Sequence, residues 1–256
     1  MIALSIVLGF IKIADMPYGG SVTVASMIPI VIAAYRHGLK WGMGAAIANS
    51  AVQLFTGIKY FSYFTTWQSI VALILFDYLI AFAVFGLAGI LRGRMKQNLA
   101  LALGALGASV LRYICHVISG ATIWMGISIP DGAAIAYSLG YNATYMIPET
   151  VILVSVAVYL GSVLDFTRDV PVRMHRETLD SRTMVYLSGA GLLTLGAIVT
   201  DCALVFPKLQ NPESGAFYLG GLGEVSWLAF GIVSGACLGA AAALALVALK
   251  RIKAKA

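Results

Sequence analysis

The chain consists of long apolar stretches separated by short polar or glycine-containing breaks, and this pattern predicts eight helices. The breaks lie at residues 15–20, 36–40, 57–67, 92–98, 127–132, 165–182 and 207–220. Apolar stretches of about 20 residues are long enough to span a bilayer as helices. The stretches at 1–14 and 21–35 are shorter, so the ends of the first two helices are the least defined. We therefore predict an all-α polytopic membrane protein.

The composition agrees with a chain that folds in lipid and not in water. Hydrophobic residues make up 60% of its 256 residues, charged residues 11%, and the mean hydropathy is +0.91. Such a chain is too apolar for a soluble globular domain. The first apolar stretch has no basic start and no small-residue cleavage pattern before Asp15, which indicates a retained helix and not a signal peptide. Cys115, Cys202 and Cys237 lie in apolar stretches without paired spacing, so neither disulfides nor a metal site is expected.

The basic residues predict the orientation, because Lys and Arg are enriched in cytoplasmic loops. With the N-terminus inside, 13 of the 17 basic residues fall in inner loops and the tail, namely Arg36, Lys40, Arg92, Arg94, Lys96, Arg168, Arg173, Arg176, Arg182, Lys250, Arg251, Lys253 and Lys255. We expect both termini in the cytoplasm. The net charge of +6 matches anionic membrane lipid. Without aromatic interleaving or a soluble basic domain, it does not indicate nucleic-acid binding.

A polar segment at 166–182 divides the chain after six predicted helices. Its mixed charges and Pro171 predict a cytoplasmic linker, and residues 183–256 then contain two further helices and a basic tail. Asp201 and Glu224 lie toward the outer ends of these helices, where a structural role is favoured over an extension of a pocket. Small residues at four-residue spacing form a ridge on the last helix, at Gly231, Gly235, Gly239 and Ala243. Such a ridge allows close packing with helix seven or with a partner, and intramolecular packing is favoured.

Polar side chains at membrane depth gather between residues 111 and 149, where we expect a ligand site. They are Arg112, His116, Trp124, Tyr137, Asn142 and Glu149, and Asp77 in the fourth predicted helix adds a carboxylate. Polar groups in a membrane are costly to keep without partners, so such a cluster predicts a ligand site or an internal network. His116 follows Arg112 by four residues and shares its helix face, where Gly120 leaves space beside the backbone.

Each of these residues also has a purely structural interpretation. Asp77 could pair with Arg112, although their predicted depths differ, and His116 could be a core histidine bonded to a neighbouring helix. Trp124 lies near the outer boundary, where tryptophan serves as an interfacial anchor. Tyr137 and Asn142 are five residues apart and point in different directions unless their helix begins irregularly. Together, an acid, an imidazole, an amide and several aromatic faces describe a pocket for a flat, partly cationic heteroaromatic molecule.

Four motifs carry a resemblance to a known family. They are PYGGSVTVASMIPIVIAAYRHGLKWG, FDYLIAFAVFGLAGIL, LRYICHVISGATIW and AIAYSLGYNATYMIPE. In this order and spacing they resemble the thiamine-specific substrate-binding subunits, or S components, of energy-coupling factor (ECF) transporters. The resemblance covers residues 1–165 and implies a six-helix core in the bacterial plasma membrane that binds thiamine from the outside. It also implies a partner module of one membrane scaffold subunit and two ATPases that powers uptake.

The resemblance further implies which residues contact the vitamin. By position these are Trp67 in the third outer loop, Asp77 and Tyr78 in helix four, His116, Gly120 and Trp124 in helix five, and Tyr137 and Asn142 in helix six. The chain departs from the family at two positions, since Gly20 and Val24 stand where relatives have a tryptophan and a glutamate. Ser21 and Thr23 offer hydroxyl groups nearby that could bond the pyrimidine.

The resemblance assigns docking to small residues on the first helix, here Ser5 and Gly9 at four-residue spacing. Other functions stay open. The ligand could be a thiamine precursor or another cationic heteroaromatic, because of the departures from the family. The chain could also be a stand-alone facilitator, since it has no glycine-rich phosphate-binding loop and ATP coupling needs another polypeptide. A membrane-embedded enzyme is the most remote alternative, because His116 with Ser119 or Cys115 lacks a third group to orient the imidazole. We expect no enzyme and no cofactor.

Overall fold

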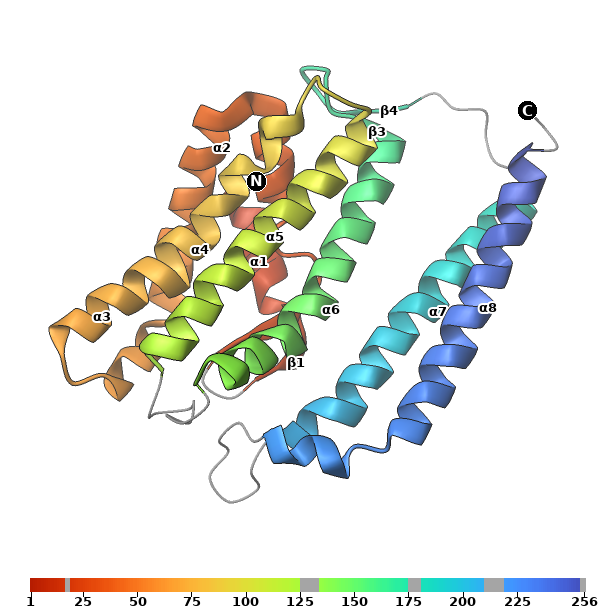
Figure 1. The fold of residues 1–256 in the computed structure, drawn as a ribbon. Coiled ribbons are helices and arrows are strands. Elements are labelled where there is room, and N and C mark those ends of the chain that lie inside the picture. Colours follow the sequence, from red (N-terminus) through yellow and green to blue (C-terminus); the bar gives the residue numbers. More distant parts are fainter. Residues whose placement is uncertain (17–18, 125–133, 175–180, 210–218, 254–256) are drawn as a thin grey trace. The chain divides into compact units, whose positions relative to one another are not determined.

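A computed structural model describes residues 1–16, 19–124, 134–174, 181–209 and 219–253 of the chain (Figure 1). These residues form eight α-helices and divide into two compact units, unit 1 up to Met174 and unit 2 from Ser181. Within the described residues, five helical segments are long and apolar enough to cross a membrane, namely Trp67–Leu91, Gln97–Thr122, Ala134–Val163, Ser181–Leu209 and Trp227–Ile252. The prediction of an all-α polytopic membrane protein is confirmed.

Unit 1 begins with a short helix and a β-hairpin. The helix α1 (Ile2–Phe10) is followed by the antiparallel strands β1 (Lys12–Asp15) and β2 (Ser21–Thr23). The first predicted helix therefore ends at Phe10, short of residue 14. The second begins at Ile28 and not at residue 21, because Ser21–Thr23 pairs with β1 as a strand. Two of these three residues, Val22 and Thr23, are β-branched and favour a strand.

The helix α2 (Ile28–Thr56) is a helical hairpin that turns at Gly38. Gly38 has φ 80° and ψ −179°, a backbone conformation that glycine adopts without steric strain. A Cβ atom on Gly42 would lie 2.6 Å from the Cα atom of Ala34, so the two halves of the hairpin pack against each other. The break predicted at 36–40 is the turn between them.

The next helical segment, Trp67–Leu91, contains a π-helical turn. The segment consists of α3 (Trp67–Leu73), the π-helix η2 (Ile74–Leu79), α4 (Ile80–Ala83) and the 3-10 helix η3 (Val84–Leu91), and it follows the 3-10 helix η1 (Ile58–Tyr63). A π-turn is wider than an α-helical turn and occurs frequently at functional sites. Asp77 and Tyr78 lie within it, so the wider turn sets the direction in which both side chains point.

Two long helices complete the helical part of unit 1. They are α5 (Gln97–Thr122) and α6 (Ala134–Val163), and a short antiparallel pair, β3 (Leu164–Asp165) with β4 (Val172–Arg173), follows them. The helices lie side by side (Figure 1). A Cβ atom on Gly161 would lie 2.7 Å from the Cα atom of Asn98, so this glycine allows a close approach of the two backbones.

The beginning of segment 166–182 packs onto unit 1. Phe166 is buried, and its backbone N–H donates to Oε1 of Gln97 at 2.9 Å. The Nη2 atom of Arg36 donates to two backbone carbonyls of the segment at 2.7 and 3.2 Å. Unit 1 therefore extends to Met174. The domain boundaries at 165 and 182 stay a prediction.

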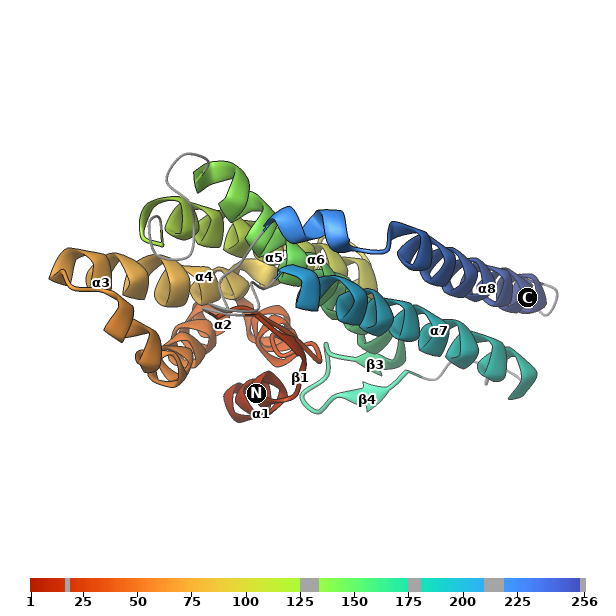
Figure 2. The same cartoon turned by 90° about the horizontal axis from the view of Figure 1, so that it is seen from below.

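Unit 2 is a pair of long helices that run side by side (Figures 1 and 2). It consists of α7 (Ser181–Val205), η5 (Phe206–Leu209), η6 (Leu219–Glu224) and α8 (Trp227–Lys253). Ser234 of α8 donates to Oδ2 of Asp201 in α7 at 2.6 Å. The Nζ atom of Lys208 lies 3.8 Å from Oε2 of Glu224. Both acids thus have partners within unit 2, which supports the structural role expected for them.

The glycine ridge of α8 does not pack on α7. Among the described residues, no atom lies within 4 Å of the position that a Cβ atom would take on Gly231, Gly235 or Gly239. The helices meet elsewhere, for example where a Cβ atom on Gly189 would lie 3.2 Å from Leu244. The interpretation that this ridge packs against the seventh helix is therefore wrong.

Candidate binding site

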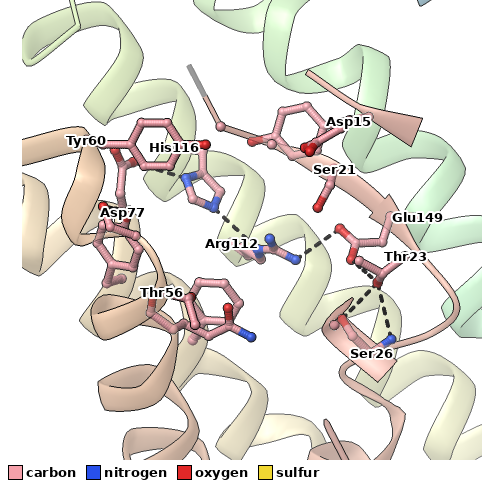
Figure 3. A pocket seen from close by; sticks show the side chains of 18 of the residues that line it. Asp15, Ser21, Thr23, Ser26, Thr56, Tyr60, Asp77, Arg112, His116 and Glu149 are labelled. Atoms are coloured by element: carbon pink, nitrogen blue, oxygen red, sulfur yellow. Dashed lines mark hydrogen bonds and ion pairs between the residues drawn. The ribbon is translucent and has the colours of Figure 1, made fainter. Parts of the chain in front are cut away.

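A cavity of about 350 Å³ lies within unit 1 (Figure 3). Its lining comes from α1, the strands β1 and β2, α2, η1, η2, α4, α5 and α6. The volume lies in the range of small-molecule sites, about 300–1,000 Å³. Elements from the whole length of unit 1 therefore enclose one space that is large enough for a small organic molecule.

Asp77 accepts hydrogen bonds from two predicted site residues. Its Oδ1 atom lies 3.1 Å from Nδ1 of His116, and its Oδ2 atom accepts from Nε1 of Trp124 at 2.8 Å. The side chains of Asp77 and His116 are only 13% and 12% exposed. Both oxygens of the carboxylate are thus bonded, one to His116 and one to Trp124. Asp77 therefore pairs with His116 and not directly with Arg112.

Arg112 continues the chain of hydrogen bonds on the other side of His116. Its Nε atom donates to Nε2 of His116 at 3.3 Å, and its Nη1 atom lies 3.1 Å from Oε2 of Glu149. Because an arginine only donates, Nε2 of His116 is the acceptor and carries no proton. The proton of the imidazole is therefore on Nδ1, where it is donated to Asp77, and His116 is neutral in this arrangement.

Glu149 connects the helices to the β1–β2 hairpin. Its Oε1 atom accepts from Oγ1 of Thr23 at 2.9 Å, and Oγ1 of Thr23 in turn lies 2.8 Å from Oγ of Ser26, whose hydroxyl group donates because the single proton of Thr23 goes to Glu149. The hydroxyl group of Tyr141 donates to the backbone carbonyl of Gly19. The chain Asp77–His116–Arg112–Glu149–Thr23–Ser26 thus runs along the cavity in Figure 3 and joins η2, α5, α6 and β2.

This chain of side chains has a net charge of −1. Asp77 and Glu149 contribute two negative charges, Arg112 contributes one positive charge, and His116 is neutral. A buried charge without a counterion is unfavourable, so the buried part of the cavity around this chain is suited to a positively charged group of a ligand. The lining also contains the exposed pair of Lys12 and Asp15, which is neutral by itself, and the exposed Lys59, so the formal charge of all lining residues is zero.

Aromatic rings form much of the remaining wall. The ring of Trp124 lies 5.0 Å from that of Phe64 and 6.3 Å from that of Tyr60, both nearly edge to face. The rings of Tyr141 and Tyr145 lie 5.9 Å apart on α6. Aromatic faces attract cations through their quadrupole, by about 0.5–2 kcal/mol each. The walls therefore favour the same charge as the network does.

Asn142 and Gly120 fix how closely α5 and α6 approach each other. The Nδ2 atom of Asn142 donates to the backbone carbonyls of Ser138 at 2.9 Å and His116 at 3.2 Å. Its Oδ1 atom accepts from the hydroxyl group of Tyr145 at 2.7 Å. A Cβ atom on Gly120 would collide with Oγ of Ser138, so only glycine fits at this position.

The structure brings most of the predicted site residues to the cavity, with two exceptions. Those that line it are Ser21, Thr23, Asp77, Tyr78, His116, Gly120, Trp124 and Asn142. Tyr137 is outside the lining and packs against the cluster that contains Trp124. Trp67 begins α3 and is 70% exposed. The irregular helix start that would turn Tyr137 toward Asn142 lies partly outside the described residues, since residues 125–133 are not described.

The predicted docking pair faces the interior of unit 1. Ser5 is fully buried, and its hydroxyl group donates to the backbone carbonyl of Ser26 at 2.7 Å. Gly9 lines the cavity, and a Cβ atom there would lie 3.6 Å from Nε2 of Gln53. Both small residues thus allow α1 to pack closely on the segment around α2.

From the sequence, Glu149 was placed in the polar cluster without an assigned contact with the ligand, and Tyr145 was missed. Both follow Asn142 on α6, at spacings of seven and three residues, and helical periodicity places such positions on the face of Asn142. This signal was present in the sequence. The lack of room for a side chain at Gly20 could not be predicted from the sequence, because it depends on where the ring of Tyr145 lies. A Cβ atom on Gly20 would lie 2.7 Å from Cε1 of Tyr145, so this ring takes the room for a side chain at residue 20.

Fold and cavity together define a membrane protein that encloses a small-molecule site within a bundle of helices. The family of thiamine transporter proteins (Thia_YuaJ) matches residues 1–167. The chain belongs to this family, and the resemblance seen in its motifs is confirmed. The thiamine transporter ThiT of Bacillus subtilis (strain 168) is 36% identical over 149 residues, which are 54% of this chain and 73% of that protein. The family match thus covers most of unit 1 and none of unit 2.

Proposed function

We propose that this chain is the substrate-capture subunit, or S component, of an ECF importer and binds thiamine from the extracellular side. The observation that carries the proposal is the cavity with aromatic walls and a buried hydrogen-bonded chain that has a formal charge of −1. Thiamine combines a permanently cationic thiazolium ring with an aminopyrimidine, so one carboxylate and several aromatic faces complement it. Membership of a thiamine transporter family supports the same ligand and a transport protein in place of an enzyme.

In this proposal, each residue that lines the cavity has its own role toward the vitamin. Asp77 balances the cation, and the faces of Trp124 and Tyr78 border the rings. Ser21, the first residue of β2, offers a hydroxyl group from the hairpin. Gly120 and Asn142 determine the width of the cavity between α5 and α6. Tyr137 supports the cluster behind Trp124 and acts without direct contact, and Trp67 makes no contact.

In this proposal the protein lies in the bacterial plasma membrane with both termini in the cytoplasm. The basic residues of the loops at 36–40 and 166–182 support this orientation, because such residues are enriched on the cytoplasmic side. The hydrogen bonds of Arg36 to the backbone beyond β3 support it as well, since they hold these two basic loops at one end of unit 1.

The partner module consists of a membrane scaffold subunit and two ATPases. Energy comes from these partners, because the chain contains no glycine-rich phosphate-binding loop with Lys and Ser or Thr. Docking through Ser5 and Gly9 requires α1 to separate from α2, since both residues face the interior of unit 1. Removal of the partner ATPases from cells should therefore abolish thiamine uptake.

The first experiment is titration calorimetry of the purified protein in detergent with thiamine. Its separate pyrimidine and thiazole moieties and riboflavin serve as controls. Tight one-to-one binding of thiamine alone is expected. Binding of one moiety without thiamine would instead identify a precursor as the ligand, and no binding of any compound would contradict the proposal.

A stand-alone facilitator is the second candidate function. A facilitator needs no energy source, so it also fits a chain without a nucleotide-binding motif. Uptake of labelled thiamine in cells without the partner ATPases separates the two candidates. Undiminished uptake would establish the facilitator and contradict the capture subunit.

A further inference from the structure

Glu149 and Arg112 form a charged pair that the proposed contacts with thiamine do not use. The pair lies in the middle of the hydrogen-bonded chain, separated from Asp77 by His116 (Figure 3). The side chains of Arg112 and Glu149 are 11% and 9% exposed, and both residues line the cavity. A guanidinium group beside a ligand site ordinarily binds carboxylate or phosphate, so its presence in a site for a cation requires an explanation.

The hydrogen bonds of Arg112 show what Glu149 does to it. Nε of Arg112 donates to His116 and Nη1 donates to Glu149, while Nη2 has no acceptor among the described residues. The guanidinium plane also stacks over the ring of Phe82, with Cζ 4.6 Å from the centroid. The edge formed by Nη1 and Nη2 is the one that binds an anion with two parallel hydrogen bonds. Glu149 occupies half of this edge and neutralises its charge.

Glu149 itself is held so that it acts on Arg112 and not on a ligand. Its Oε2 atom accepts from Arg112, and its Oε1 atom accepts from Thr23 at 2.9 Å. Thr23 is buried and bonded to Ser26, so the hydroxyl group keeps this orientation. Both carboxylate oxygens therefore have partners within the protein.

We propose that Glu149 determines the specificity of the cavity by making it reject phosphate esters of its ligand. This inference rests on the proposed binding of thiamine and names the residue that excludes its monophosphate. A phosphate group would add about −1.5 to −2 charges to a network that already has a charge of −1. Neutralising Glu149 would bring the network to zero and weaken its bond to Nη1, so that the Nη1–Nη2 edge of Arg112 can turn to the phosphate oxygens.

The experiment compares the dissociation constants of thiamine and thiamine monophosphate by titration calorimetry of the full chain in detergent. In Glu149→Gln, the ratio of the monophosphate constant to the thiamine constant should fall by about 10- to 100-fold, the scale of one charge-assisted hydrogen bond. Glu224→Gln is the matched control, because Glu224 is 65% exposed in unit 2. Its ratio should equal that of the unaltered protein.

Arg112→Gln provides a second test that does not depend on the recovery of the first variant. It leaves both carboxylates and removes the cation, so the monophosphate should be rejected more strongly and the ratio should rise. A ratio that stays constant in either variant while thiamine still binds the unaltered protein would overturn the inference alone. Absence of thiamine binding by the unaltered protein would overturn the proposed function and the inference with it.

Discussion

The two units of this protein each contain an acidic side chain within a long membrane helix, but the two side chains differ in their hydrogen bonds. Asp77 in unit 1 is bonded on both oxygens, to His116 and Trp124, and begins a chain that reaches the β1–β2 hairpin. Asp201 in unit 2 accepts from Ser234 on one oxygen, and its other oxygen has no partner among the described residues. The difference indicates that a connected polar network around a cavity marks a ligand site, whereas a single bond between two helices marks a packing contact.

The largest expected difference between the units concerns their acidic residues. Asp77→Asn removes the negative charge and leaves one acceptor oxygen for two donors, His116 and Trp124. Thiamine binding should weaken by about 2–5 kcal/mol, which is about 30-fold or more. Asp201→Asn should change it by less than about twofold, because its partner lies in unit 2. Calorimetry on both variants checks this, and equal losses would refute the assignment of the site to η2.

A smaller effect is expected from glycines in the two units. Gly120→Ala places a methyl group against Ser138, whose hydroxyl group donates to the backbone carbonyl of Val117. This overpacking should cost about 1–3 kcal/mol of stability. Gly235→Ala on the open ridge of α8 should be neutral or stabilise the helix by up to about 1 kcal/mol. The midpoint of thermal unfolding in detergent measures both, and a similar decrease in the two variants would contradict the contrast.

The smallest effect is expected from the tryptophans. Trp124→Phe keeps an aromatic ring but loses the N–H group that donates to Asp77. The affinity for thiamine should fall by about tenfold, the scale of one hydrogen bond to a charged group. The quench of tryptophan fluorescence on binding should disappear. Trp227→Phe in α8, which is 52% exposed, is the control and should keep the quench. A quench of undiminished size in Trp124→Phe would show that another tryptophan reports the ligand.

Several features of the fold could be predicted from the sequence because they depend on short-range rules. Apolar stretches and polar breaks locate the long helices, and the break at 36–40 coincides with the turn at Gly38. The strands β1 and β2 were not predicted, since an apolar stretch of this length fits a helix as well as a strand. The π-turn at Ile74–Leu79 leaves no mark in the hydrophobic pattern, because every residue around it is apolar except Asp77.

The candidate site was partly predictable for a similar reason. Asp77 and His116 stand out, because a polar group within an apolar helix needs a partner. Which partner each one has was not predictable, since it depends on how neighbouring helices are rotated. Asp77 was weighed as a partner of Arg112, but the structure places His116 between them.

The sequence by itself determined the solvent of this protein, its helical class, its family and the segments that contain its polar residues. The family depends on the order of four motifs, and the other properties depend on composition and on local periodicity, all of which any unfolded or folded chain of this sequence shares. Only the tertiary structure decided that Tyr145 takes the room beside Gly20, that Glu149 holds Arg112 and that the buried hydrogen-bonded chain has one unbalanced charge. Hydrogen bonds are directional and short, so residues 126 positions apart, such as Thr23 and Glu149, become partners only after the helices have packed.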